Sequence, residues 1–227
     1  HELLHTLRGE PGPGALHAGL TAMSLLMERA SRDKAALGEA VTLLGELETP
    51  LWHAGWHRAF AELYDALSPP LQAAGVEPRD IAPRLWFRRA RARVQSVDWS
   101  LPHPGLGSAE VEPAVSALAA QELPLAISEL SALLSLSETT IMAARARLGL
   151  PVVGPEVSDW CRQLPYKARQ ARGYARLLQL LALGPTAADP EAARAAGAQW
   201  QAAIDDIVLA LSHFVAEGDA ENIAQTL

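Results

Sequence analysis

Six arginines lie within the segment 79–93, where the only acid is Asp80. The segment therefore carries a net charge of +5 in a protein whose formal charge is −7, so the rest of the chain carries −12. On a helix, Arg84, Arg88 and Arg91 share a face because they are four and three residues apart. Guanidinium groups offer a planar fork of donors that suits phosphate oxygens or carboxylates. We expect this face either to contact nucleic-acid phosphates or to pair with the protein's own acids.

His53 and His57 form a second candidate site. If one helix holds both, their imidazoles share a face, as a pair of metal ligands requires. No HExxH motif or cysteine lies nearby, and His17 or Glu48 would complete a ligand set only through the fold. The simpler interpretation is surface or part-buried histidines beside the aromatic stripe of the neighbouring tryptophans. We therefore expect no metal and no other cofactor, and a metal protein built on this pair stays an alternative.

The sequence shows no arrangement of nucleophile, acid and base that is typical of an enzyme. It has no glycine-rich phosphate loop and no GxSxG motif, and Cys161 has only Arg162 as a cationic neighbour. Asp205 and Asp206 are adjacent, so on a helix they point about 100° apart and do not form a dyad. An enzyme is an alternative only as a helical fold that assembles its site from distant residues.

The segment Ile127 to Gly149 has two amphipathic halves separated by the short stretch Ser135 to Ser137. Apolar residues at helical spacing line one side of each half: Ile127, Leu130 and Leu134, and then Ile141, Ala144 and Leu148. Leu136 in the turn is expected to point inward, and Ser137 to cap the second helix. The spacing predicts two short helices that meet at a tight turn.

With its small residues at the crossing, its buried turn residue and its β-branched residue within the second helix, the segment resembles the helix-turn-helix family of DNA-binding proteins. The resemblance covers residues 127–149, about a tenth of the chain. It implies that the second helix enters the major groove with its first turns at the base edges. The positions implied to face the bases are Ser137, Glu138, Thr139, Thr140, Met142, Ala143 and Ala146, while Arg145 and Arg147 would reach phosphates. The alternative is two ordinary helices of an all-α core.

Helices must position all of these residues, because alanine and leucine dominate the chain and β-branched residues occur singly. The periodicity predicts four helices in the first hundred residues, at about 15–30, 34–48, 51–67 and 78–97. Pro50 and the pair Pro69-Pro70 are expected to end the second and third. The third is predicted to bury a single stripe, which consists of Trp52, Trp56, Phe60, Leu63 and Leu67.

The predicted fold class is all-α, with an N-terminal bundle, a central helix-turn-helix and a C-terminal helical hairpin. The expected divisions are 1–99, a linker at 100–109 rich in proline and glycine, 110–155, and 156–227. The hairpin helices are expected at about 165–183 and 189–216. We expect the long apolar stripe of the hairpin to be a dimer surface. On the second helix this stripe consists of Trp200, Ile204, Ile207, Leu211 and Phe214. A homodimer would offer two reading helices to two half-sites of double-stranded DNA.

The composition favours a folded chain, with 49% hydrophobic and 20% charged residues. No apolar run approaches the roughly 18 to 20 residues that span a bilayer, so no membrane partner is expected. The single cysteine excludes an internal disulfide, and the start shows no secretory signal, which together favour the cytoplasm. We expect a DNA-binding transcription regulator or DNA-maintenance factor, and not an enzyme. The main alternative is a helical scaffold whose arginine face docks an acidic partner.

Overall fold

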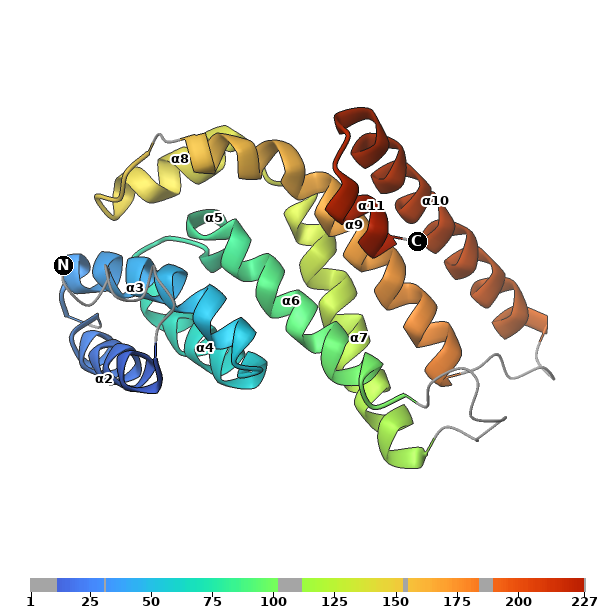
Figure 1. Ribbon diagram of the computed structural model, residues 1–227, viewed down its shortest axis with the longest axis horizontal. Helices are drawn as coiled ribbons and strands as arrows, with labels where there is room; N and C mark the ends of the chain where they lie inside the picture. Colours follow the sequence, from blue (N-terminus) through green and yellow to red (C-terminus); the bar gives the residue numbers. More distant parts are fainter. Residues whose placement is uncertain (1–11, 31, 102–111, 153–154, 184–189, 227) are drawn as a thin grey trace. The chain divides into compact units, whose positions relative to one another are not determined.

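The computed structural model describes residues 12–30, 32–101, 112–152, 155–183 and 190–226 (Figure 1). The described residues form helices and no strand, which confirms the predicted all-α class. The helices are α2 (Pro13–Ala30), α3 (Lys34–His53), α4 (His57–Ala73), α5 (Pro78–Ile81), α6 (Pro83–Asp98), α7 (Pro113–Leu133), α8 (Glu138–Arg147), α9 (Pro155–Leu183), α10 (Pro190–Glu217) and α11 (Ala220–Thr226).

The chain forms two compact units, and each consists of two separate stretches of sequence. The first unit contains residues 1–89 and 136–160, and the second contains residues 90–135 and 161–227. This division differs from the predicted order of bundle, linker, motif and hairpin, because α8 belongs with the N-terminal helices while α7 belongs with α9 and α10. The predicted linker at 100–109 lies almost wholly outside the described residues.

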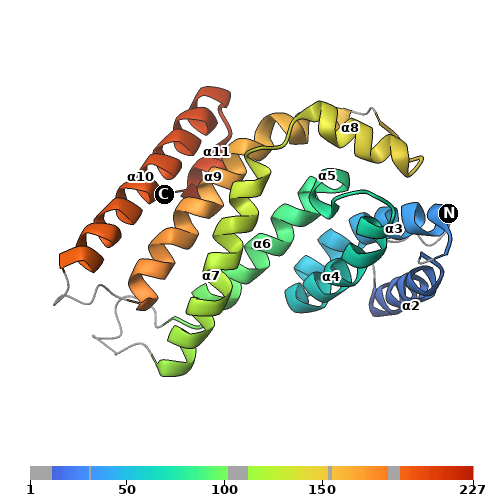
Figure 2. The ribbon, with the colours of Figure 1, turned by 180° about the vertical axis from the view of Figure 1, so that it is seen from behind.

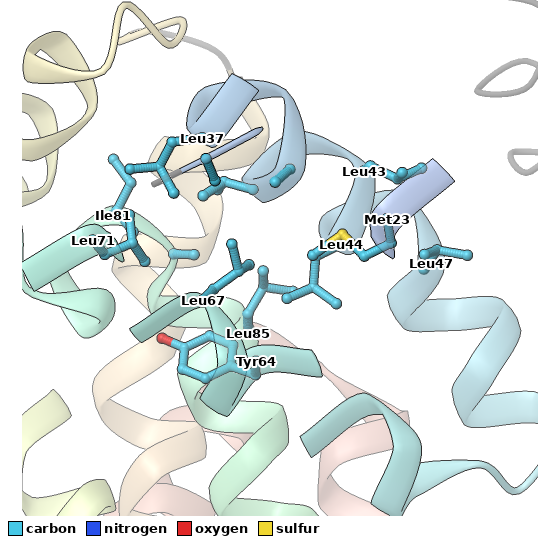
Figure 3. Packing of buried hydrophobic residues seen from close by; sticks show 14 of the residues in the cluster. Met23, Leu37, Leu43, Leu44, Leu47, Tyr64, Leu67, Leu71, Ile81 and Leu85 are labelled. Carbon is cyan, nitrogen blue, oxygen red and sulfur yellow. The ribbon is translucent and has the colours of Figure 1, made fainter. Parts of the chain in front are cut away.

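The first unit is organised around a leucine-rich core (Figure 3). Helices α2 to α5 and the start of α6 supply its buried side chains, among them Met23, Leu44 and Ile81. Each leucine removed from water contributes about 1.5–3 kcal/mol, so this cluster is the main source of stability in the unit. Ala144 of α8 and Leu148, the residue that follows α8, belong to the same core.

The predicted helix ends at Pro50 and Pro69 are wrong, since both prolines lie inside helices. An interior proline removes one backbone hydrogen bond and costs about 3 kcal/mol, which tertiary packing can offset. Pro50 is itself buried. The breaks that do occur coincide with Gly55 and Gly75, whose φ angles of 76° and 71° other residues rarely adopt.

The predicted third and fourth helices are also divided differently. A break after His53 puts Trp52 and Trp56 outside a single helical stripe, and Trp56 is 42% exposed, not buried in the core. The expected helix at 78–97 is split into α5 and α6 at Ala82. Because the residue before a proline avoids the helical region, Ala82 adopts φ −143° and ψ 66° ahead of Pro83.

The second unit packs α7, α9 and the end of α6 around smaller side chains, with α10 lying beside α9 (Figure 2). Its core contains Ala119, Leu123, Ala175 and Leu178. Helices α9 and α10 approach closely at Gly173, where a Cβ would lie 2.8 Å from the carbonyl oxygen of Ala203. The absent side chain therefore permits the contact between the two backbones.

A carboxylate on α10 fastens the same pair of helices. Asp206 is 3% exposed and receives hydrogen bonds from three arginines of α9, which are Arg169, Arg172 and Arg176. Arg172 donates to both of its carboxylate oxygens, at 2.8 and 2.7 Å, and also to the hydroxyl of Ser131 on α7. These charge-assisted bonds fix the register of α9 against α10.

Candidate nucleic-acid interface

Helix α8 begins with the cap that the sequence predicts. Ser137 has extended backbone angles, and its Oγ accepts a hydrogen bond of 3.2 Å from the backbone N–H of Thr140. The same hydroxyl lies 2.9 Å from Thr139 Oγ1 and 2.8 Å from Thr140 Oγ1. A serine cap satisfies one of the free N–H groups of a helix start and contributes about 1 kcal/mol. Three hydroxyl groups therefore gather at the first turn.

The other end of α8 is closed by a glycine. Gly149 has a φ of 68°, and its N–H donates to the carbonyl oxygen of Ala146, while the N–H of Leu150 donates to that of Arg145. This pair of bonds is a Schellman motif, which satisfies the last carbonyl groups of the helix. Both ends of α8 are therefore fixed by local sequence.

The buried side of α8 is the one expected from its spacing. Ile141, Ala144 and Leu148 are 2%, 7% and 7% exposed. Leu148 lies over α3, where its carbonyl oxygen is 3.2 Å from the position that a Cβ on Gly38 would take. Helix α8 is thus seated in the first unit by apolar contacts along a single face.

The opposite side of α8 is open to solvent. Of the residues implied to face DNA bases, only Met142 is half-buried, and the others are exposed: Ser137, Glu138, Thr139, Thr140, Ala143 and Ala146. This surface is polar near the start of the helix and small toward its end.

The two arginines of α8 bind the protein's own backbone. Arg145 Nε donates to the carbonyl oxygen of Pro151 at 2.7 Å, and its Nη1 lies 3.4 Å from that of Ile81. Arg147 is exposed, and its Nη1 donates to the carbonyl oxygen of Gly75 at 2.8 Å. Both side chains therefore hold α8 against α5 and the segment after α4, a role that the sequence did not suggest.

The arginines of α6 pair with acids, as the second interpretation of this segment expected. Arg84 and Arg88 form ion pairs of 2.7 and 2.5 Å with the two carboxylate oxygens of Glu48, whose side chain is 1% exposed. Further along the helix, Arg89 pairs with Asp65. Arg93, in the second unit, pairs with Glu122 and Glu129. Arg91 is half-buried. Two of the three cations predicted to form a phosphate track, Arg84 and Arg88, are thus paired with an acid of the first unit.

Sequence reasoning overlooked the structural importance of Glu48 and Asp206, although a signal for each was available. Glu48 continues the helical stripe of Leu37, Val41 and Leu44, and Asp206 lies on a corresponding stripe of α10. An acid at a buried stripe position requires a cationic partner, because an unpaired buried charge is costly. Arginines at spacings of three and four on another helix supply that partner in both units.

His53 and His57, the pair considered as an alternative metal site, do not lie on one helix. His53 is the last residue of α3 and is exposed, whereas His57 is the first residue of α4. The His57 ring meets the edge of Trp52, with centroids 4.2 Å apart, and Arg88 lies over the same indole. Burial, and then the charge of Arg88, lower the pKa of His57. Within the described ranges, no three His, Cys, Asp or Glu side chains gather to hold a metal ion.

The predicted helix-turn-helix spans the boundary between the units, since α7 belongs to the second unit and α8 to the first. No single described helix is long and apolar enough to cross a membrane. Neither a protein-family model nor a curated protein nor a solved structure matches the chain.

Proposed function

We propose that the protein binds double-stranded DNA through the exposed face of α8. The observation that carries the proposal is the division of this helix into a buried apolar side and an open side with three hydroxyls and one carboxylate at its first turn. Serine and threonine hydroxyls bond to several base edges, and a glutamate accepts from the amino group of cytosine. The helix N-terminus is the part that meets base edges in helix-turn-helix proteins.

The small residues of α8 suit a close approach to the groove. Ala143 and Ala146 lie six and nine residues beyond the cap and are exposed, so this part of the open face carries short side chains. Alanine and the threonine methyl group also make apolar contacts with the methyl of thymine. In this proposal Glu138, Thr139 and Thr140 read the bases, with Ser137 placing the hydroxyls around it.

Phosphate contacts are few in this proposal. Arg84 and Arg88 are bound to Glu48, and Arg145 is half-buried and donates to the carbonyl oxygens of Pro151 and Ile81. Arg147 is exposed and would exchange its bond to the Gly75 carbonyl oxygen for a phosphate. One phosphate contact gives a slope of about −1 in a plot of log affinity against log salt concentration. We therefore expect weak binding with a shallow salt dependence, in keeping with the net charge of −7.

Fluorescence anisotropy with a labelled duplex of randomised sequence, at low salt and up to micromolar protein, tests the proposal. Ala143→Glu and Ala146→Glu each add a negative charge to the open face without touching the core, and each should weaken binding about tenfold or more. Ala18→Glu, on the exposed side of α2, is the matched control and should bind as the wild type does.

Two results would overturn DNA binding by α8. One is the absence of any anisotropy change with wild-type protein at low salt, which would favour the helical scaffold. The other is equal binding by the two α8 variants and the control, which would mean that another surface contacts the duplex. Because the variants leave the buried side unchanged, circular dichroism should show the same helix content for all three proteins.

A further inference from the structure

Helix α10 has two apolar faces, and only one of them is used inside the second unit. Ala203, Ala210 and Phe214 are buried on the inner face. Trp200, Val208 and Val215 lie on the outer face and are 50%, 54% and 58% exposed, although their side chains are large and apolar. Ile204 and Leu211 are half-buried between them.

The sequence prediction of the dimer surface mixed these two faces. It included Phe214, which is 1% exposed and packs inward, and Ile207, which reaches toward the site of Gly173. It omitted Val208 and Val215, which are open. Trp200, which the predicted surface includes, does lie on the outer face. We name this face the outer stripe of α10, and its members are Ala193, Gly197, Trp200, Ile204, Val208, Leu211 and Val215.

The positions of the outer stripe are symmetric about Ile204. Its members lie four, seven and eleven residues to either side of that residue. A second α10 that runs in the opposite direction would therefore meet the stripe in register over its whole length, with Ile204 packed against the same residue of the other copy. Steps of three and four residues are also those that pack helices in antiparallel pairs.

Side-chain size favours the antiparallel direction. The N-terminal half of the stripe begins with Ala193 and Gly197, both exposed, and a Cβ built on Gly197 meets no atom within 4 Å. The C-terminal half ends with the bulkier Leu211 and Val215. Antiparallel pairing sets Leu211 against Gly197 and Val215 against Ala193, so large residues fill the space beside small ones. Parallel pairing would set small against small at one end and large against large at the other.

We propose that the protein forms a two-fold homodimer by antiparallel pairing of the outer stripes of α10. The stripe is roughly 33 Å long at 1.5 Å per residue. A strip about 10 Å wide then buries roughly 300–400 Å² on each copy, which is below the size of a standard stable interface. The dimer should therefore dissociate at micromolar concentrations. Dimer formation does not require DNA. The dimer proposal can therefore be tested independently of the function proposed for α8.

An acid beside the symmetry axis gives the dimer a characteristic salt dependence. Asp205 is exposed next to Ile204 and accepts a hydrogen bond from Gln201 on its own helix. Antiparallel pairing brings the two Asp205 carboxylates to the same side of the axis, where they repel one another. Added salt screens this repulsion and should strengthen dimerisation, whereas it weakens DNA binding.

Sedimentation velocity of the full chain from about 1 to 100 µM, without DNA, tests the proposal. The wild type should pass from monomer to dimer. Val208→Asp should raise the dissociation constant about tenfold or more, because it buries a charge in the interface. Leu209→Asp is the matched control, since Leu209 is 49% exposed on the same helix but outside the stripe, and it should dimerise as the wild type does. A monomeric wild type at 100 µM would overturn the dimer.

Disulfide trapping tests the direction of pairing. A mixture of Gly197→Cys and Leu211→Cys proteins, both with Cys161→Ser, should give a disulfide between the two different proteins on mild oxidation. Preferential linkage of each protein to its own kind would instead indicate parallel pairing and overturn the antiparallel arrangement. Equal loss of dimer in Val208→Asp and Leu209→Asp would show that the outer stripe is not the interface.

Discussion

Among the described residues, each unit contains one buried carboxylate that arginines from another helix bind, and the two sites differ in the number of arginines that bind them. In the first unit, Glu48 on α3 receives Arg84 and Arg88, one at each oxygen. In the second unit, Asp206 on α10 receives three arginines from α9, and one of them, Arg172, binds both oxygens. The side chain of Arg84 is 44% exposed, whereas that of Arg172 is 15% exposed.

The comparison shows how the two units balance charge in different ways. The two arginines bound to Glu48 give that site a net charge of +1, and the three arginines bound to Asp206 give that site a net charge of +2. Burial, followed by the neighbouring charge of Arg172, lowers the pKa of Arg176, while Asp206 opposes that change. Asp206 therefore keeps three guanidinium groups together that would otherwise repel one another. A buried ion pair contributes little beyond an apolar contact, but its loss leaves uncompensated charge.

Asp206→Asn should lower the stability of the protein more than any substitution at Glu48. It leaves three arginines without their carboxylate and should lower the free energy of unfolding by about 3–5 kcal/mol. Urea denaturation followed by circular dichroism measures the change. Asp205→Asn, at the exposed neighbouring position, is the control and should change stability by less than about 0.5 kcal/mol. A small effect at Asp206 would mean that helix packing alone holds α9 to α10.

Glu48→Gln should destabilise the protein less, by about 2 kcal/mol, since Arg84 can turn its guanidinium toward water once the carboxylate is lost. The same urea titration gives the value. Arg84→Ala should cost less than Arg88→Ala, because Arg88 is less exposed and also lies over the ring of Trp52 at 4.8 Å. If Glu48→Gln cost more than Asp206→Asn, the proposed order of the two sites would be reversed.

The two units can also be compared at one glycine each, where another part of the backbone comes close. A Cβ at Gly173 would lie 2.8 Å from a carbonyl oxygen of α10, and a Cβ at Gly38 would lie 3.2 Å from that of Leu148. Gly173→Ala should therefore destabilise by about 1–3 kcal/mol through overpacking, and Gly38→Ala by less. Thermal unfolding of both variants checks the order. Gly45→Ala is the control, because a Cβ there meets nothing within 4 Å.

The smallest expected effect is a pH dependence of stability that arises from His57 in the first unit. The pKa of His57 is lowered in the folded state from its ordinary value of 6.5. As pH falls through about 6.5, the unfolded chain binds a proton that the folded chain does not, so stability declines until the folded pKa is reached. Urea midpoints between pH 8 and pH 5 measure the decline. His57→Gln should reduce this slope, and His53→Gln, on the exposed residue, controls for the loss of a histidine.

The sequence predicted the helices well where local signals decide their limits. Helix α10 runs from Pro190 to Glu217 and ends at Gly218, as expected, and Ser137 caps α8. The inner face of α8 was also predictable from its spacing. These features depend on residues that are neighbours along the chain, so a single sequence contains the information that specifies them.

Other features depend on contacts between distant segments, and the sequence could not supply them. Pro50 lies within a helix whereas Pro83 begins one after a break, and the surrounding core decides which occurs. Trp200 and Phe214 both belong to apolar rows of α10, but only the fold determines that Phe214 is buried while Trp200 is half-exposed. The pairing of the α6 arginines with Glu48 likewise required the fold.

The alternation of the chain between the two units has a consequence for experiments on fragments. Two of the three passages from one unit to the other occur within helices α6 and α9. A protein shortened to residues 1–99 would therefore lose the helix that covers part of its leucine core, and one that starts at residue 110 would keep α8 without the surface on which it rests. No single cut yields either unit intact, so domain-mapping by truncation would produce two incomplete pieces.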